Sequence, residues 1–153
     1  MAAVIVRPMQ SEDLEAAAAI EATALDAWSL DSMRVELSNH MHGHGVPQLF
    51  VAELEGRIAG LAVFHLILDE ISLYTITVDP ALRGQGIGRA LLEGGLQDLQ
   101  RMGGRFCYLE VRSQNAPARA LYEHMGFETV GKRKNFYQNP PDDAVLMCLD
   151  VMK

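Results

Sequence analysis

Hydrophobic and polar positions follow two different periods along the chain, and these periods predict its secondary structure. In residues 85–101 the apolar positions fall at steps of four, one, four and three, which places them on one face of a helix. Those positions are Ile87, Leu91, Leu92, Leu96 and Leu99. Short apolar or alternating runs bounded by turn residues predict strands. The predicted strands cover residues 3–9, 48–56, 57–68, 71–78, 105–112, 127–137 and 144–152.

Capping residues mark where further helices begin. Ser11, Ser29 and Asn115 each stand at a position where an N-cap is favoured. The helices that they precede are expected over residues 12–25, 30–39 and 116–124. The resulting order, βααβββαβαββ, contains no repeat, no low-complexity segment and no linker. This order predicts a single mixed α/β (α+β) domain over residues 1–153.

The formal net charge of −7 over 153 residues narrows the range of partners. A protein this acidic is a poor binder of nucleic acid or anionic membranes through diffuse charge, although it suits a basic polypeptide substrate. No apolar run reaches the length of a membrane span, and the first residues lack the features of a secretory signal. Cys107 and Cys148 are too few and too separated for a disulfide framework or a zinc site. We therefore expect a cytoplasmic protein with reduced thiols.

Three glycines alternate with other residues at the start of the helix expected over residues 85–101. Gly84, Gly86 and Gly88 leave backbone N–H groups free to converge on an anion, and the helix dipole adds partial positive charge. A phosphate-bearing ligand is the first expectation. The loop lacks the Gly-Lys-Ser/Thr ending of a Walker motif, and Arg89 stands where a dinucleotide fingerprint needs its third glycine. A nucleotide ligand is therefore a weaker alternative, as is a glycine turn without a ligand.

The wider pattern around these glycines resembles the GNAT superfamily of N-acetyltransferases. Residues 83–88 have the form R-x-x-G-x-G, which in that superfamily binds a pyrophosphate. The sequence I-T-V-D-P precedes this motif at residues 76–80, and N-x-x-A-x-x-L-Y-x-x-x-G-F follows it at residues 115–127. The order of elements also agrees over nearly the whole chain. The resemblance implies a mixed central sheet with flanking helices, in which the strand ending at Val78 splays away from the strand at residues 108–111.

Within the superfamily the chain is similar to the RimI type, which acetylates the N-terminal alanine of a ribosomal protein. The similarity rests on Trp28-Ser29, Asp69-Glu70, LEVRSQN at residues 109–115, KNFY at residues 134–137 and D-A-x-x-M at residues 143–147. The chain departs from the family pattern at Gln114, where serine is usual. It also has KNFY where the family often has Arg-Asn-Tyr-Tyr.

The resemblance implies roles for the residues that match these motifs. Acetyl-CoA would be the co-substrate, with its pantetheine amides on the main chain of a strand and its pyrophosphate on the glycine loop. The residues implied to bind it are Ile76, Thr77, Val78, Arg83, Gly84, Gln85, Gly86, Ile87, Gly88, Arg89 and Asn115. Glu110 would act as the base and Tyr122 as the acid, since a phenol with an ordinary pKa of about 10 keeps its proton at neutral pH.

Each of these assignments has a structural alternative. Glu110 could be a solvated residue on an edge strand, and Tyr122 could be a core aromatic of an amphipathic helix. Trp28 is either an ordinary core residue or part of the wall of an acceptor site. Residues 132–134 would either contact the 3′-phosphate of the cofactor or form a solvated strand end.

Histidines at three alternating positions raise the question of a metal site. His40, His42 and His44 lie in a glycine-containing segment with no cysteine nearby. Metal sites need fixed geometry, so we interpret this segment as a solvated loop and expect no metal.

Four functions compete at this point. The first is acetylation of a protein N-terminus, and the second is acetylation of lysine or a small amine. The third is a non-catalytic module that senses acyl-CoA or binds a partner, and nucleotide binding comes last. The presence of both Glu110 and Tyr122 favours an enzyme over a module. The sequence sets no oligomeric state.

Overall fold

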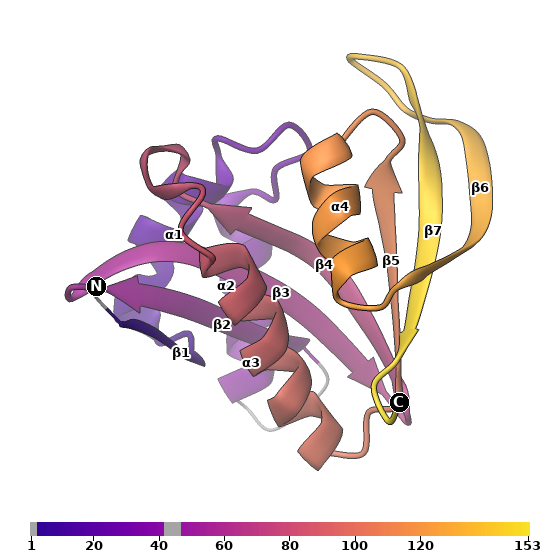
Figure 1. The fold of residues 1–153 in the computed structure, drawn as a ribbon. Coiled ribbons are helices and arrows are strands. Elements are labelled where there is room, and N and C mark those ends of the chain that lie inside the picture. The colour runs from indigo at the N-terminus through magenta and orange to yellow at the C-terminus, as the bar shows by residue number, and fades with distance from the viewer. Residues whose placement is uncertain (1–2, 42–46) are drawn as a thin grey trace.

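The computed structural model describes residues 3–41 and 47–153. Its strands are β1 (Val4–Pro8), β2 (Pro47–Leu54), β3 (Arg57–Ile67), β4 (Glu70–Val78), β5 (Phe106–Arg112), β6 (Glu128–Tyr137) and β7 (Asp142–Asp150). Its α-helices are α1 (Leu14–Glu21), α2 (Leu30–Met41), α3 (Ile87–Arg101) and α4 (Ala116–His124). The described residues form one seven-stranded sheet in the order β1-β2-β3-β4-β5-β7-β6, with helices on both faces (Figure 1). The predicted order of elements and the mixed α/β class are confirmed.

Local capping explains most of the helix boundaries. The Ser29 hydroxyl accepts a hydrogen bond from the Ser32 backbone N–H at 3.0 Å, and the Asn115 side chain accepts one from Ala118 at 3.2 Å. Both predicted caps are thus confirmed. The predicted cap at Ser11 is wrong, because a 3-10 turn with Gln10 as its N-cap occupies Ser11–Asp13 and the α-helix follows only from Leu14.

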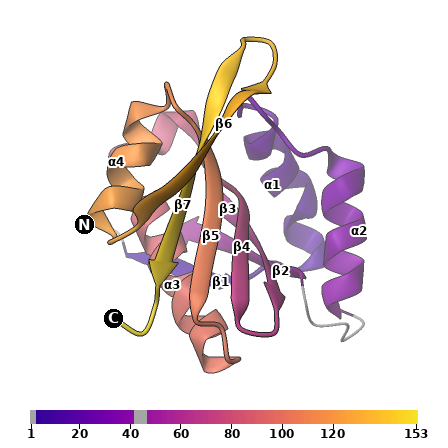
Figure 2. The same cartoon turned by 90° about the vertical axis from the view of Figure 1, so that its right-hand side faces the viewer.

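Alternation along the strands divides the hydrophobic residues between two cores. One core lies between the sheet and helices α3 and α4 and includes Phe50 and Phe64. The other lies under α1 and α2 and includes Val51 and Val63. Figure 2 shows the two pairs of helices on opposite sides of the sheet. Helix α3 approaches closely at Gly95, where an added Cβ would lie 2.5 Å from the Phe64 ring.

Strands β4 and β5 are the one parallel pair in the sheet that the described residues form, and they separate before either strand ends. Their register runs from Glu70↔Phe106 to Leu73↔Leu109 and goes no further. Tyr74 is an extra residue in β4, since the pairing with β3 passes from Val63↔Thr75 to Phe64↔Leu73. A bulge of this kind bends the strand that carries it. Figure 1 shows the carboxyl ends of β4 and β5 pointing apart. The splay implied by the resemblance is therefore present, although it begins after Leu109 rather than at Tyr108.

Among the described residues, no helix is long and apolar enough to cross a membrane. Cys107 is buried and Cys148 is half-buried, and both are free thiols, as expected.

Candidate active site

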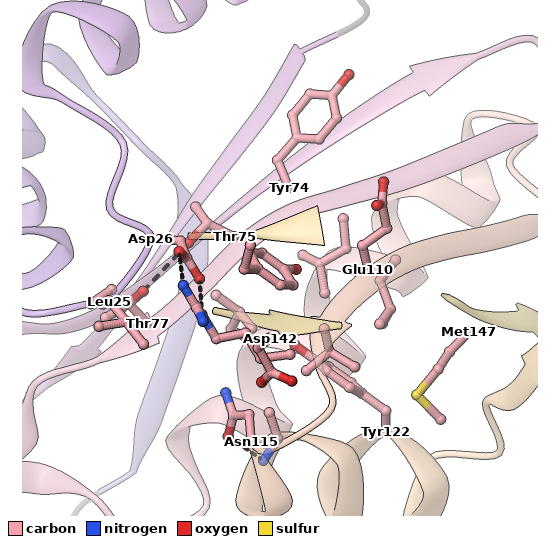
Figure 3. A pocket seen from close by; sticks show the side chains of 18 of the residues that line it. Leu25, Asp26, Tyr74, Thr75, Thr77, Glu110, Asn115, Tyr122, Asp142 and Met147 are labelled. Atoms are coloured by element: carbon pink, nitrogen blue, oxygen red, sulfur yellow. Dashed lines mark hydrogen bonds and ion pairs between the residues drawn. The ribbon is translucent and has the colours of Figure 1, made fainter. Parts of the chain in front are cut away.

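The space between the separated strands is a cavity of about 1320 Å³. Its walls come from the splayed parts of β4 and β5, the α1–α2 connection, the amino-terminal ends of α3 and α4, and the β6–β7 hairpin. Figure 3 shows side chains from several of these segments converging on it. β4 and β5 do not pair with each other along this cavity. The backbone N–H and C=O groups that each strand directs into the gap therefore have no partner on the opposite strand.

The glycine loop forms one end of this region. Gly84 and Gly86 have φ angles of 83° and 79°, and Gly86 is the N-cap of α3. An added Cβ at either residue would meet no atom within 4 Å, so positive φ rather than crowding makes glycine necessary. The first helical hydrogen bond runs from the Ala90 N–H to the Gly86 carbonyl at 3.0 Å. The N–H groups before it have no partner within the helix, which suits an anion.

The structure brings only part of the predicted binding set to the cavity wall. Six of these residues line it: Ile76, Thr77, Val78, Arg83, Gly88 and Asn115. Gly84, Gln85 and Gly86 are exposed beside it, whereas the Ile87 side chain is 2% exposed and belongs to the core. Arg89 does not line the cavity, and its guanidinium bonds to Glu93 at 2.7 Å. The side-chain oxygen of Asn115 caps α4, so the side-chain NH2 group is left to donate to a ligand.

A buried carboxylate fixes the separated part of β4. Glu21, at the end of α1, is 0% exposed. It accepts hydrogen bonds from the hydroxyl of Thr77 at 2.6 Å, from Thr75 at 2.9 Å and from the Trp28 N–H at 3.0 Å. The Thr77 side chain is thus occupied, and only its main chain is left to face a ligand. Sequence reasoning missed Glu21, since its partners lie up to 56 residues away.

Glu110 and Tyr122 both line the cavity, but they belong to opposite sides of the sheet (Figure 3). Leu109 and Val111 point into the core under α3 and α4, so Glu110 between them points to the α1 and α2 side. Glu110 is exposed, and its carboxylate lies 3.8 Å from the Arg133 guanidinium. β5 is not an edge strand of the sheet, but its pairing with β4 ends at Leu109, so Glu110 is a solvated residue whose strand is paired there with β7 alone.

Tyr122 is at once a core residue and a cavity residue. It is 6% exposed, and its ring packs at a tilt on Phe127 with centroids 5.6 Å apart. Burial raises the pKa of the Tyr122 phenol well above its ordinary value, and nearby Cys107 and Tyr137 add to the effect. The phenol therefore stays protonated at neutral pH and is able to donate a proton but not to accept one. The gap between β4 and β5 connects it to the side of the sheet on which Glu110 lies.

Stacked rings continue the wall on the Glu110 side. Tyr74 lines the cavity, stacks on Trp28 with centroids 5.4 Å apart, and stacks on His65 at 5.6 Å. Its hydroxyl lies 3.0 Å from the His65 Nδ1. Trp28 packs against the core, and it stacks on a cavity residue without lining the cavity itself.

A buried guanidinium joins two of the connections around the cavity. The Arg112 side chain is 7% exposed, and it forms a two-pronged ion pair with Asp26, with both distances 2.9 Å. It also donates to the carbonyls of Pro140 at 2.7 Å and Gln138 at 3.2 Å, and its Cζ lies 4.4 Å from the Tyr137 ring centroid. The hydrogen bonds to Asp26 raise the pKa of Arg112. No motif in the sequence pointed to this group.

The remaining expectations concern charged and histidine-rich segments. Lys132 and Lys134 are exposed and stand apart from the cavity, whereas Arg133 lines it. His42 and His44 lie outside the described residues, as does the side chain of His40. Among the residues that the structure describes, no group of three His, Cys, Asp or Glu side chains is arranged to hold a metal ion.

Comparison with known proteins adds the family context. The model of the acetyltransferase (GNAT) family matches residues 12–127. The chain is 42% identical over 98 residues to the [ribosomal protein bS18]-alanine N-acetyltransferase of Escherichia coli (strain K12), a match that covers 63% of this chain and 66% of that protein. A Bacillus subtilis (strain 168) protein provisionally described as an enzyme of the same kind is 31% identical over 147 residues, 95% of each chain.

A solved structure is similar over almost the whole chain. The crystal structure of the ribosomal-protein-S18-alanine N-acetyltransferase from Escherichia coli superposes with a TM-score of 0.86 at 34% identity. The superposition covers 97% of this chain and 94% of that one. The seven-stranded sheet and its splay therefore belong to a known architecture.

The ordinary phenol pKa is about 10. We expect the four tyrosines of the chain to stay protonated to pH values above it. Burial raises the pKa of Tyr137 to about 12 and raises those of Tyr74 and Tyr122, while the Cys148 thiol raises that of Tyr108. Since these raised values favour the neutral phenol in the folded state, their contribution to stability is full below about pH 10 and is lost at higher pH.

The measurement is a pH titration of tyrosinate absorbance, carried out on the native protein and on the protein unfolded in urea. The native curve should lie at higher pH than the unfolded curve, whose midpoint is expected near pH 10. A native signal at about pH 8–9 that disappears in the Tyr122→Phe variant would contradict a raised pKa at Tyr122.

Proposed function

Because the chain belongs to the acetyltransferase (GNAT) family, we propose that it is an enzyme that transfers acetyl from acetyl-CoA to an N-terminal α-amine. The acceptor we propose is a ribosomal protein with a small first residue, typically alanine. The observation that carries the proposal is the splay between β4 and β5, with Glu110 on one side of the sheet and Tyr122 on the other. The names of the Escherichia coli and Bacillus subtilis relatives support the acceptor.

The cavity suits acetyl-CoA in both shape and hydrogen bonding. Its volume of about 1320 Å³ exceeds the usual range for small-molecule pockets, as an extended ligand requires. The unpaired main chain of residues 76–78 offers partners to the two amides of the pantetheine arm, which removes the cost of burying those amides. The N–H groups at the start of α3 would hold the pyrophosphate, with Arg83 as the nearest lining cation. Asn115 would bond the cofactor near its reacting end through its amide.

Two side chains move the protons of the reaction. Glu110 takes a proton from the incoming amine, directly or through a water, so that the nitrogen lone pair is free to form the new amide bond. The thioester C–S bond breaks as that bond forms, Tyr122 gives its proton to the departing sulfur, and the second proton of the nitrogen restores the Tyr122 phenol. The buried Tyr122 holds that proton at neutral pH because its pKa is raised. The exposed Glu110 is accessible to the end of a polypeptide that arrives from solvent.

The chemistry of the acceptor also favours an α-amine over lysine. An α-amine with a pKa of about 7.7–8.0 is roughly a tenth neutral at pH 7, whereas lysine at about 10.4 is neutral to only ~0.04%. One carboxylate base therefore meets a several-hundredfold larger pool of reactive α-amine. We further propose that residues 1–153 act as one catalytic domain in the cytoplasm, where a ribosomal protein is available.

The first prediction tests the acceptor. A peptide with a free N-terminal alanine should be acetylated at that amine, because a far larger fraction of the α-amine than of lysine is neutral at pH 7. The same peptide with a blocked N-terminus and an internal lysine should react far more slowly. Mass spectrometry locates the acetyl group. Equal or faster labelling of lysine would replace the N-terminal proposal with lysine or small-amine acetylation, and tight acetyl-CoA binding without any transfer would favour a sensing module.

The second prediction tests the glycine loop against a matched control. Gly86→Val and Gly56→Val both place a β-branched residue at positive φ, 79° and 77°, with no atom within 4 Å of the added Cβ. The two variants should therefore lose similar stability. Only Gly86→Val should weaken acetyl-CoA binding, by about tenfold or more, since the loss of one charge-assisted hydrogen bond already has that effect. Calorimetry on the folded variants measures this, and equal affinity in both variants would remove the pyrophosphate assignment.

The third prediction concerns the proton-transfer residues. Glu110→Gln and Tyr122→Phe should each slow turnover by ~10²–10⁴-fold while acetyl-CoA affinity holds. The rate of Glu110→Gln should recover partly as pH rises through about 8, because the α-amine then loses its proton without help. Glu123→Gln, an exposed change on α4, is the control and should retain wild-type turnover. Rates close to wild type in both active-site variants would mean that other groups move the protons.

A further inference from the structure

The Arg112 guanidinium makes all of its hydrogen bonds with two connections that flank the cavity. Its guanidinium bonds to both carboxylate oxygens of Asp26 in the α1–α2 connection. Its other donors bond to the main-chain carbonyls of Gln138 and Pro140 in the β6–β7 connection. Figure 3 shows the Asp26 carboxylate and its dashed bonds at the edge of the cavity. One side chain at the end of β5 therefore joins the two connections.

The position of these contacts is on the acceptor side of the cavity. Glu110 and Arg112 are two residues apart on β5, so their side chains leave the same face of the sheet about 7 Å apart. Asp26, Tyr137 and Pro140 line the cavity together with Glu110. The glycine loop that suits the pyrophosphate precedes α3, whose packing against the sheet lies on the opposite face. A polypeptide whose amine reaches Glu110 from the α1 and α2 side must therefore pass the two connections.

Arg112 and Asp26 differ in how deeply they are buried. The Arg112 side chain is 7% exposed and needs its partners, because an unpaired buried charge is costly. Asp26 is 48% exposed, so water reaches its carboxylate, and the cost of breaking the ion pair would lie mainly with the buried Arg112. Loss of the Asp26 carboxylate would leave Arg112 bonded to the two carbonyls but would release the α1–α2 connection. Arg112 thus anchors the arrangement, and Asp26 ties the α1–α2 connection to it.

We propose that Asp26 and Arg112 form a clasp that fixes the spacing of the α1–α2 and β6–β7 connections and thereby positions the acceptor polypeptide at Glu110. Both are positioning residues, since they act through the connections and take no part in proton transfer. This inference rests on the proposed N-terminal acetyltransferase activity. It predicts an effect on the binding of a polypeptide acceptor, with acetyl-CoA binding and the chemical step unchanged.

The test compares Asp26→Asn with Asp31→Asn in the full-length protein. Asp31 also pairs with an arginine, Arg34 at 3.4 Å, but it is a 92%-exposed residue outside the cavity wall. Asp26→Asn should raise the KM for an eight-residue peptide with N-terminal alanine about tenfold, the size expected for one charge-assisted bond. Its kcat, its acetyl-CoA affinity and its KM for alaninamide, which is too short to span the connections, should stay near wild type. Asp26→Glu, which keeps the carboxylate, should recover most of the peptide KM.

A second readout does not depend on activity. Trp28 is the one tryptophan of the chain and lies in the α1–α2 connection. Quenching of its fluorescence by acrylamide should increase in Asp26→Asn and stay at the wild-type level in Asp31→Asn, because only the first change frees the connection. Circular dichroism confirms that all variants are folded.

The outcomes separate the clasp from the proposed function. An unchanged peptide KM in Asp26→Asn, or equal increases in KM for the peptide and alaninamide, would overturn the clasp while leaving the acetyltransferase assignment intact. If the wild-type protein acetylates no N-terminal peptide, the proposed function fails and the quenching experiment decides on the clasp alone. In that case, unchanged quenching overturns the clasp and increased quenching supports it.

Discussion

The separation of β4 from β5 is the constraint on which the site depends. Two parallel strands in the middle of a sheet ordinarily pair along their length, yet here the register stops at Leu73↔Leu109. The bulge at Tyr74 turns the rest of β4 away, so both strands expose main-chain groups to one cavity. Such groups are costly when they are buried without partners. The fold leaves them accessible, and an extended ligand with amides of its own is the natural partner for them.

Two buried polar side chains support the separated strands, one on each side of the gap. Glu21 holds β4 through the hydroxyls of Thr75 and Thr77, and Arg112 holds the end of β5 through the α1–α2 and β6–β7 connections. Each of these side chains has several hydrogen bonds, as a buried polar group requires. Their partners come from different segments of the chain, so the same bonds that compensate burial also set the shape of the cavity.

Local sequence signals were sufficient to predict the helices and strands. They were insufficient to predict the buried side chains that support the separated strands. Apolar spacing, caps and glycines predicted every strand and helix of the described residues in order, because such signals act over a few residues. The same signals overextended the first helix, which ends at Glu21 although the alanine-rich segment continues. Glu21, Tyr74 and Arg112 could not be predicted in this way. Their roles depend on partners up to 86 residues away or on a bulge that appears only when the strands pair.

The two proposed proton-transfer residues lie in opposite environments, and this difference fixes which role each could have. Tyr122 is buried under α4, where its raised pKa keeps the phenol protonated, so it fits the proposed donor role and not that of a base. Glu110 is exposed on the other face, where the charged end of the proposed polypeptide acceptor would arrive without losing its own hydration first. A proton donor beside the sulfur would help the thiolate to leave, and a carboxylate within reach would accept the proton that the amine gives up. The gap between the strands allows both conditions within one cavity, because it connects the two faces of the sheet.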